Sequence, residues 1–337
     1  MIYFRYSKYI DSWRFQVNWV KVRFIRPMNI EDIIFKYING AILSVNPLGD
    51  GHINDTFLVE TGTGKYVMQR VKGSMDIESC EHNYGLYSRL FEDSGWKYPV
   101  WIKNSDGRFF YTDETASHWR LYSFIDGEIL EAPIDDEMLY SCGKGLARMH
   151  MILGNIKGSP KAVYPHLHDL RFYHDMYQRI IESGDFLAEN RDPAIEEKIS
   201  AKAVSMLSIE QDRSDVVHGD AKLANILFKS GEVIGFIDFD TLMPGSRLED
   251  LADCIRSCCT KDGVLDKEKA KKIVQGYTDN IPEKMVSGIE KLPDVYDKIC
   301  FELGLRYYTD AIAKEKVFKE KYPGFRLDRA RSLFSNL

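Results

Sequence analysis

The stretch that decides the fold is Val217-His218-Gly219-Asp220-Ala221-Lys222-Leu223-Ala224-Asn225-Ile226-Leu227-Phe228, followed by Val233-Ile234-Gly235-Phe236-Ile237-Asp238-Phe239-Asp240. Asp220 stands five residues before Asn225, and Asp238 follows thirteen residues after Asn225 at the end of an apolar run. Two short apolar runs separated by the turn-forming residues 229–232 predict a β-hairpin. We therefore expect Asn225 and Asp238 to approach each other across this hairpin.

These three side chains suit phosphoryl transfer. In that reaction the protein mainly positions the nucleophile and neutralises charge on the transferred group. We expect Asp220 to be catalytic and to accept the proton of a substrate hydroxyl group. Asn225 and Asp238 offer hard oxygen ligands, which suit Mg²⁺. A single Asp would more simply cap a turn or end a strand, but the ordered set favours a reaction with ATP and Mg²⁺.

The order of a catalytic-loop Asp, a catalytic-loop Asn and a metal-binding Asp resembles that of protein-kinase-like enzymes. The form His-Gly-Asp-x-x-x-x-Asn, with Asp-Phe-Asp in place of Asp-Phe-Gly, resembles the aminoglycoside phosphotransferase family of small-molecule kinases. The resemblance implies an α+β, two-lobed, protein-kinase-like fold with a small β-rich lobe and a large, mainly helical lobe. We expect residues 28–125 to form the nucleotide-binding lobe and residues 126–337 to form the catalytic and substrate-binding lobe.

Composition narrows the class of protein. The chain has 337 residues, 44% of them hydrophobic, and a net charge of −6, so a broad basic surface for nucleic acid is not expected. No run of 18 apolar residues occurs, so we expect no transmembrane helix and no membrane partner. The six cysteines form no Cys-x-x-Cys pair and are typical of reduced thiols in a cytoplasmic protein. No obligate protein partner is evident.

Residues 1–27 differ from the rest of the chain. They are rich in aromatic and basic residues and lack the apolar core and cleavage site of a signal peptide. Met28 then precedes a natural helix start. We expect residues 1–27 to be an extension outside the fold, and an amphipathic segment at a membrane surface is the alternative.

A glycine-containing stretch near the amino terminus is a candidate phosphate-binding loop. Gly49-Asp50-Gly51-His52-Ile53-Asn54-Asp55-Thr56 precedes an extended apolar run, and paired glycines allow backbone amides to approach phosphates. The residues of this stretch that we assign to nucleotide binding are Gly49, Gly51, Asn54 and Thr56.

The next strand, residues 65–71, should supply a cation for the α- and β-phosphates. Arg70 is our candidate, with Lys65 and Lys72 as lesser ones. If Val67 packs against adenine, the alternation of the strand places Gln69 on the phosphate face instead.

The remaining nucleotide contacts are expected from a helix and from a strand. The helix spans residues 76–91, and its Glu81 should pair with the phosphate-binding cation. The strand spans residues 119–125 and ends the small lobe. Adenine should bind to its backbone, through Tyr122, Phe124 and Ile125.

The large lobe should be mainly helical. The expected helices share apolar positions at helical spacing and cover residues 137–151, 171–183, 194–207, 266–277, 282–291 and 294–316. We interpret His150 as a packing or capping residue. Asp250 or Asp253 should brace the catalytic loop through backbone amides. Arg306 and Asp310 lie four residues apart and predict, most simply, a helical salt bridge.

A closer resemblance rests on several motifs together: Gly49-x-Gly51-His52-Ile53-Asn54-x-Thr56, Gln69-Arg70-Val71, Glu81-x-Asn83, Phe236-Ile237-Asp238-Phe239-Asp240-Thr241-x-Met243-Pro244-Gly245 and Arg306-x-x-x-Asp310. They are similar to those of N-acetylhexosamine 1-kinases. This resemblance implies transfer of the ATP γ-phosphate to the anomeric hydroxyl of N-acetylglucosamine or N-acetylgalactosamine, a small sugar substrate. It also implies that Asp220 and Arg306 contact the sugar and that His52 and Asp169 line its pocket.

Two alternatives stay open. One is a kinase of another small hydroxyl compound, such as an aminoglycoside, choline or a different sugar. A choline or aminoglycoside site should offer an acidic or aromatic cage for a cation. The other is a nucleotide-binding pseudokinase or interaction module, against which the intact Asp220, Asn225 and Asp238 argue.

Overall fold

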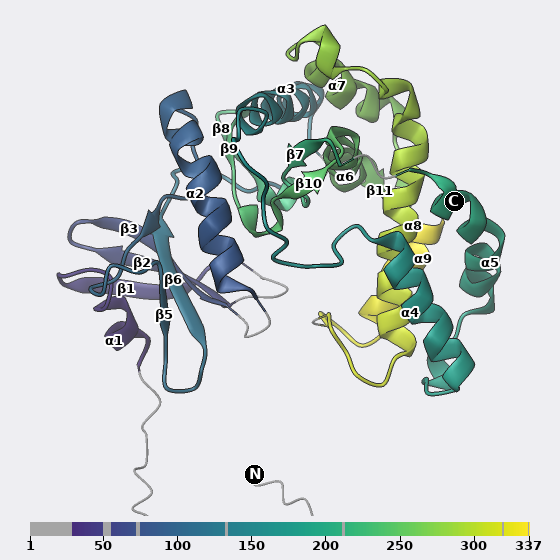
Figure 1. Ribbon diagram of the computed structural model, residues 1–337, viewed down its shortest axis with the longest axis horizontal. Coiled ribbons are helices and arrows are strands. Elements are labelled where there is room, and N and C mark those ends of the chain that lie inside the picture. The colour runs from purple at the N-terminus through teal and green to yellow at the C-terminus, as the bar shows by residue number, and fades with distance from the viewer. Residues whose placement is uncertain are drawn as a thin grey trace, which may run out of the picture.

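The computed structural model describes residues 29–49, 55–71, 75–131, 134–210, 213–318, 320–335 and 337. A β-sheet with two helices is followed along the chain by a larger, mainly helical part (Figure 1). The expected extension, residues 1–27, lies outside the described residues. So do Gly51, His52 and Asn54 of the glycine-containing stretch, and Lys72.

The amino-terminal part is built on one antiparallel sheet of order β1-β2-β3-β6-β4, with β5 also paired to β6. Its elements are α1 (Ile30–Ile34), β1 (Ile42–Pro47), β2 (Asp55–Thr61), β3 (Gly64–Val71), α2 (Ile77–Ser94), β4 (Trp101–Ile102), β5 (Phe110–Thr112) and β6 (His118–Ser123). Met68 packs with α1, whereas Val71 belongs to the core that includes α2. The two helices thus cover opposite faces of the sheet.

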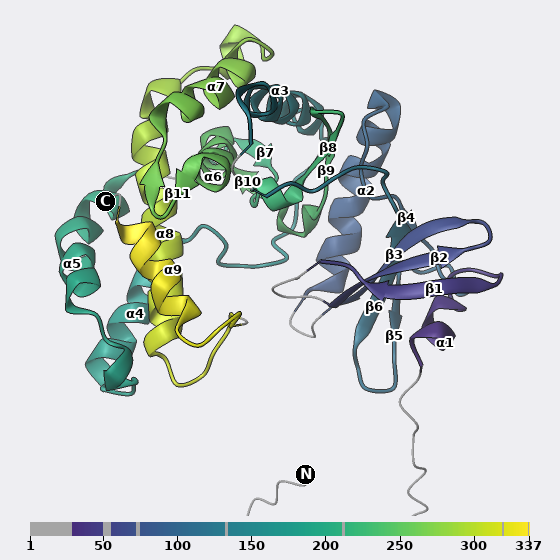
Figure 2. The ribbon, with the colours of Figure 1, turned by 180° about the vertical axis from the view of Figure 1, so that it is seen from behind.

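The carboxy-terminal part consists of helices around two short hairpins. Its α-helices are α3 (Asp136–Leu153), α4 (Leu170–Ser183), α5 (Pro193–Ser208), α6 (Arg247–Cys259), α7 (Lys267–Thr278), α8 (Leu292–Ile312) and α9 (Phe325–Phe334). Its strands are β7 (Asp215–Val217), β8 (Ile226–Lys229), β9 (Glu232–Phe236), β10 (Met243–Gly245), β11 (Thr260–Lys261) and β12 (Val264–Leu265). Seen from behind, α9 runs beside α8 (Figure 2).

The predicted hairpin is confirmed. β8 pairs with β9 in antiparallel register, from Ile226 opposite Phe236 to Lys229 opposite Glu232. Ser230 and Gly231 connect the strands with φ values of 53° and 82°, the backbone of a tight hairpin turn. The hairpin is also fixed from outside, because the backbone of Glu128 exchanges two hydrogen bonds with that of Phe228.

One predicted helix is wrong. Residues 282–291 form two separate 3₁₀ turns, Glu283–Met285 and Ile289–Lys291, and not one α-helix. Gly288, at φ 85°, separates the two turns, so helical hydrogen bonding cannot continue through it. The next helix, α8, ends at Ile312 and not at the expected residue 316, because Ala313 is extended.

Two helices of this part pack at unusually close range. A Cβ atom at Gly143 of α3 would overlap the carbonyl oxygen of Ile273 on α7, and one at Gly276 of α7 would overlap that of Tyr140 on α3. Glycine at both positions therefore lets the two backbones touch. The closeness fixes the position of α3, which carries His150, relative to α7, which carries Tyr277.

The cysteines are buried and unlinked, as the absence of a paired pattern predicts. Among the described residues, none of the helices combines the length and the apolar character needed to cross a bilayer.

Candidate active site

One buried carboxylate holds the backbone of the loop that contains Asp220, which we call the catalytic loop. Asp250 of α6 accepts hydrogen bonds from the backbone amides of His218, at 2.7 Å, and Gly219, at 2.8 Å. His150 reaches the same carboxylate at 3.0 Å and contacts the Tyr277 hydroxyl at 2.9 Å through its other ring nitrogen. Of the two acids expected to brace the loop, Asp250 does so. His150 is 1% exposed and acts through Asp250.

Gly219 is the position where the loop requires glycine. Its φ is +79°, and a Cβ atom there would overlap the Thr241 carbonyl oxygen. The Thr241 hydroxyl donates to the His218 carbonyl at 2.8 Å, so the loop also touches the segment after Asp238. The backbone just before Asp220 is therefore fixed on two sides.

Asp220 is ionised and hydrogen-bonded. Its carboxylate accepts from Lys222 Nζ at 2.5 Å and from Asn225 Nδ2 at 3.1 Å. Burial alone would raise the pKa of Asp220, but the charge and hydrogen bond of Lys222 outweigh it, so the pKa lies below its usual range. An ionised carboxylate at this place is suited to accept a hydroxyl proton.

Asn225 and Asp238 fit a divalent cation. The side-chain amide nitrogen of Asn225 donates to Asp220, which turns the side-chain amide oxygen away from that carboxylate. The backbone carbonyl of Asn225 accepts from the backbone amide of Ile237 at 3.0 Å. Asp238 adopts the left-handed conformation, with φ 66° and ψ 57°, which is uncommon outside glycine. Burial, followed by the neighbouring Asp240, raises the pKa of Asp238 to about 6. Such crowded anionic oxygens suit Mg²⁺.

A buried cation that was not expected lies at the centre of the site. Arg120 of β6, 3% exposed, forms two 2.6 Å hydrogen bonds with the carboxylate of Asp240. Its Nε donates to Gln69 Oε1 at 2.8 Å. Arg120 thus joins the sheet to the Asp-Phe-Asp turn. The sequence feature that could have revealed Arg120 is its charge, which interrupts the mostly apolar stretch from Trp119 to Ile125.

Arg70 does not occupy the place expected for the phosphate-binding cation. Its guanidinium donates to the Ser117 hydroxyl at 2.8 Å and lies over the Trp119 ring, on the face of the sheet that α1 covers. Successive residues of a strand point to opposite faces, so Gln69 faces the other way, toward Arg120. The expected pair with Glu81 is not formed between these two described residues.

The other expected nucleotide residues lie in the strands of the sheet or in the segments that flank them. Gly49, with φ +69°, ends a described segment, and Thr56 of β2 lies opposite Gln69 of β3. The Phe124 amide donates to the Lys65 carbonyl at 3.2 Å, which engages it within the sheet. Tyr122 lies within β6, opposite Val67 of β3, and Ile125 follows the end of β6 before the chain reaches the helical part.

The wall formed by α4 and α8 carries the expected acceptor residues. Arg306 of α8 lies 4.8 Å from the Tyr173 ring centroid and 3.9 Å from Glu302. Asp169 caps α4 by accepting from the Phe172 amide at 3.0 Å. The predicted pair between Arg306 and Asp310 is not formed.

Asp310 has other partners than the one predicted. It binds Arg326 Nε at 2.7 Å and accepts from the amides of Val317 and Phe318. It therefore holds the chain that follows α8 against α9.

His168 connects this wall to the catalytic loop. Its Nε2 contacts the Gly219 carbonyl at 2.8 Å, and its Nδ1 lies 3.4 Å from the buried Glu302. Burial would lower the pKa of His168, but the Glu302 contact outweighs burial and raises it to about 9. The residue sits in Tyr-Pro-His-Leu-His-Asp, where no sequence pattern marked it.

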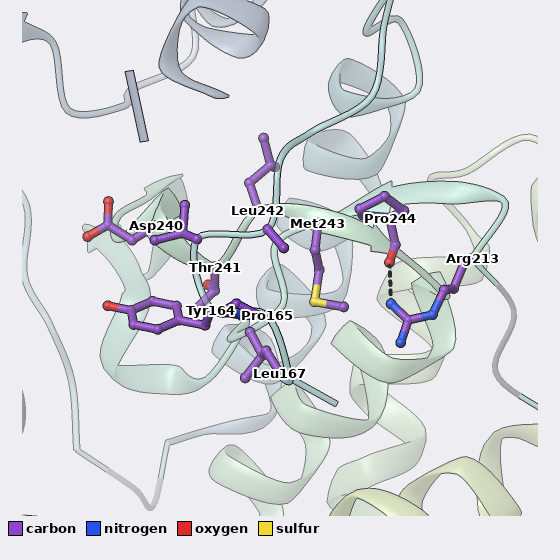
Figure 3. A pocket seen from close by; sticks show the side chains of 11 residues that line it. Tyr164, Pro165, Leu167, Arg213, Asp240, Thr241, Leu242, Met243 and Pro244 are labelled. Carbon is purple, nitrogen blue, oxygen red and sulfur yellow. Dashed lines mark hydrogen bonds between the residues drawn. The ribbon is translucent and has the colours of Figure 1, made fainter. Parts of the chain in front are cut away.

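A small hollow of about 50 Å³ lies beside Asp240, between residues 162–167 and 240–244. Figure 3 shows the Asp240 carboxylate and the Tyr164 hydroxyl pointing the same way from these two segments. Arg213 closes the other end by reaching the Pro244 carbonyl at 3.5 Å. The hollow is too small for a nucleotide or a sugar, and it is compatible with bound water.

Comparison with known proteins shows what this geometry is similar to. Residues 44–278 match the family described as "Phosphotransferase enzyme family". The chain is 23% identical to homoserine kinase of Allorhizobium ampelinum, over 75% of this chain and 76% of that one. It is 25% identical to homoserine kinase of Hyphomonas neptunium, over 82% and 83% respectively.

Solved structures share the fold at lower identity. A microcompartment-associated aminopropanol kinase has a TM-score of 0.62 and 16% identity, covering 90% of this chain and 94% of that one. An amicoumacin kinase in complex with AMP-PNP and Ca²⁺ has a TM-score of 0.61 and 11% identity, covering 90% and 92%. The two-lobed kinase-like fold is therefore shown.

Proposed function

The chain belongs to the phosphotransferase enzyme family, and from this premise we propose that it transfers the γ-phosphoryl group of ATP to a hydroxyl group of a small molecule. The observation that carries the proposal is the assembly of Asp220, Asn225 and Asp238 at one loop and hairpin. All three groups that the reaction needs are intact, which disfavours a pseudokinase.

Each residue has a distinct role in this proposal. Asp220 orients the acceptor hydroxyl and takes its proton as the oxygen bonds to the γ-phosphorus, while the bond to the β–γ bridging oxygen breaks and ADP leaves. Asn225 and Asp238 would hold Mg²⁺, which supplies charge neutralisation to the phosphates when bound. Lys222 forms an ion pair with Asp220 and would offset the negative charge of that carboxylate beside the phosphates.

The first candidate acceptor is an N-acetylhexosamine, phosphorylated at its anomeric hydroxyl. The motifs around Gly49, Asp240 and Arg306 support it by resemblance. An anomeric hydroxyl is more acidic than an ordinary alcohol, so a carboxylate such as Asp220 is sufficient as the acceptor of its proton. If the pocket reads the acetamide, glucose and galactose should be poorer substrates.

The second candidate acceptor is homoserine. The curated relatives cited above carry that name and align over three quarters or more of this chain, although their identity is low. A hydroxy amino acid is smaller than a sugar and carries a carboxylate and an ammonium group, so the two candidates differ in charge as well as in size.

An ADP-release assay across a panel of acceptors tests both candidates. The panel contains N-acetylglucosamine, N-acetylgalactosamine, glucose, galactose, homoserine, choline and an aminoglycoside, with NMR of the product to locate the phosphate. We expect one acceptor to give a kcat/KM well above the rest, and Asp238→Ala to abolish turnover or sharply raise the Mg²⁺ requirement. Phosphate on a 6-hydroxyl would exclude the anomeric reaction, and turnover unaffected by Asp238→Ala would contradict the proposed centre.

A further inference from the structure

A cavity of about 310 Å³ lies beside the catalytic loop, on a different side from the hollow at Asp240. Its walls come from the segment after Ile125, from the catalytic loop, from the end of α6 with β11, and from α8 and α9. Figure 2 shows β11, α8 and α9 gathered in one region of the helical part. The volume lies within the range of small-molecule sites.

Three cations line this cavity: Lys222, Arg256 and Arg329. Lys222 is paired with Asp220 at 2.5 Å, and Arg256 with Asp253 at 2.8 Å. Among the described residues, no other side chain or backbone group forms a hydrogen bond or an ion pair with the Arg329 guanidinium, although the backbone of Arg329 belongs to α9. It is the cation of the cavity whose charge is available to a ligand.

The surroundings of Arg329 favour an anion. Burial, and then the positive charge of Arg256, lower the pKa of the Arg329 guanidinium. The two acids that also line the cavity, Glu131 and Asp262, are exposed residues at its rim. A carboxylate placed between the arginines would relieve their repulsion and accept paired N–H donors from the planar guanidinium of Arg329.

The cavity also adjoins the reacting group. Lys222 both lines the cavity and touches the Asp220 carboxylate. A molecule whose acidic group lies at Arg329 can therefore extend past Lys222 and present a hydroxyl group to Asp220. Lys222 thus links the cations of the cavity to the carboxylate of Asp220.

We propose that Arg329, with Arg256 beside it, binds a carboxylate of the acceptor, so that the substrate is a hydroxy acid. This inference rests on the proposed kinase function and narrows its acceptor class. It favours a carboxylate-bearing acceptor, such as a hydroxy amino acid or an acidic acetamido sugar, over a neutral hexosamine.

Matched acceptor pairs test the proposal on the full chain. One pair is L-homoserine and its carboxamide, and the other is N-acetylmuramic acid and N-acetylglucosamine. Within each pair the phosphorylated hydroxyl is the same and the carboxylate is present or absent. For the acid of the preferred pair, we expect Arg329→Met to lower kcat/KM about 10- to 100-fold, the range of a lost charged hydrogen bond. The partner without a carboxylate should be used equally by the unchanged protein and by Arg329→Met.

Two variants serve as controls. Arg331→Met changes an arginine of the same helix that pairs with Asp192 and Asp328 outside the cavity, and it should leave both acceptors unaffected. Arg329→Lys keeps the charge and should retain part of the preference for the acid. Melting temperatures of all three variants separate a loss of folding from a loss of binding.

The outcomes distinguish the two levels of inference. Equal use of the acid and of its carboxylate-free partner by the unchanged protein, or equal losses for both in Arg329→Met, would overturn the carboxylate site and leave the kinase function intact. Without turnover of any acceptor the proposed function fails, and ligand-observed NMR with L-homoserine and N-acetylmuramic acid then decides the site. Binding that Arg329→Met abolishes supports the site, and absent or unchanged binding rejects it.

Discussion

The two sides of the catalytic loop are built in different ways. On the phosphate side, Asp220, Asn225 and Asp238 come from one short stretch of chain that a hairpin folds back on itself. On the proposed acceptor side, His168 comes from the turn before α4 and Arg306 from α8, more than a hundred residues later, and the two meet through Glu302. The residues proposed for the reaction chemistry are thus specified locally, whereas those proposed for acceptor recognition depend on how helices pack.

The largest expected effect concerns the short stretch that contains Asp220, Asn225 and Asp238. Asp220→Asn should lower kcat about 10²- to 10⁴-fold, because the amide cannot take the hydroxyl proton, while ATP binding persists. Steady-state kinetics and calorimetric titration with ATP measure the two quantities. Asp126→Asn, at an exposed acid paired with Lys229, is the control and should be active. A kcat within tenfold of normal would remove Asp220 from the mechanism.

The second effect concerns the junction between the sheet and the hairpin. Arg120→Met leaves Asp240 buried without its partner and should lower the free energy of unfolding by about 3–5 kcal/mol. Arg120→Met combined with Asp240→Leu should recover much of that loss, because no buried charge is left unpaired. Urea unfolding measures both free energies of unfolding. Arg191→Met, which breaks the more exposed ion pair with Glu196, is the control and should cost about 1 kcal/mol or less. A small loss of stability in Arg120→Met would mean that water reaches the pair of Arg120 and Asp240.

The third effect probes the helical side through pH. The folded pKa of His168, about 9, lies above its ordinary value of 6.5. Its ion pair with Glu302 therefore stabilises fully below about pH 6.5, and that contribution is lost as the pH rises through about 9.

His168→Gln should accordingly be less stable than the unchanged protein at pH 6, by about 1–2 kcal/mol, and nearly equal to it at pH 10. Chemical unfolding at several pH values measures this difference, to which Glu249 on α6 and Arg306 also contribute charge. A difference that does not vary with pH would show that His168 is neutral in the folded protein.

The smallest effect is on the acceptor wall. Arg306→Ala removes a cation that contacts Tyr173 and Glu302, a contact of about 0.5–2 kcal/mol, so the acceptor KM should rise a few-fold to about 30-fold. The KM for ATP should stay nearly constant. Kinetics with each substrate varied in turn separate the two, and an equal rise in both KM values would place Arg306 outside the acceptor site.

The contrast also explains which features could be predicted from the sequence. The hairpin and its tight turn follow from short-range patterns, and the structure agrees with them. The sequence left the bracing of the loop open between Asp250 and Asp253, and the structure selects Asp250. The choice between Gln69 and Arg70 failed because alternation separates the two faces of a strand but does not say which face meets the cleft. That depends on where α1 and α2 pack.

The missed residues depend on partners distant in the sequence. His168 acquires its role from a carbonyl 51 residues away, and Arg329 from a cavity that five segments enclose. No local pattern marks either one. Lys222, by contrast, stands two residues after Asp220, so the motif itself contained the signal of a cation beside the proposed proton acceptor, although no role was predicted for it.

The close contact between α3 and α7 has a consequence for how the protein tolerates mutation. Gly143 and Gly276 touch no reacting group, yet they set the spacing between His150 and Tyr277, which together orient Asp250 beneath the catalytic loop. A single added methyl group at either glycine should therefore inactivate the enzyme from a distance. In a saturation-mutagenesis map we expect a second intolerant patch there, remote from the cleft, where even alanine is rejected.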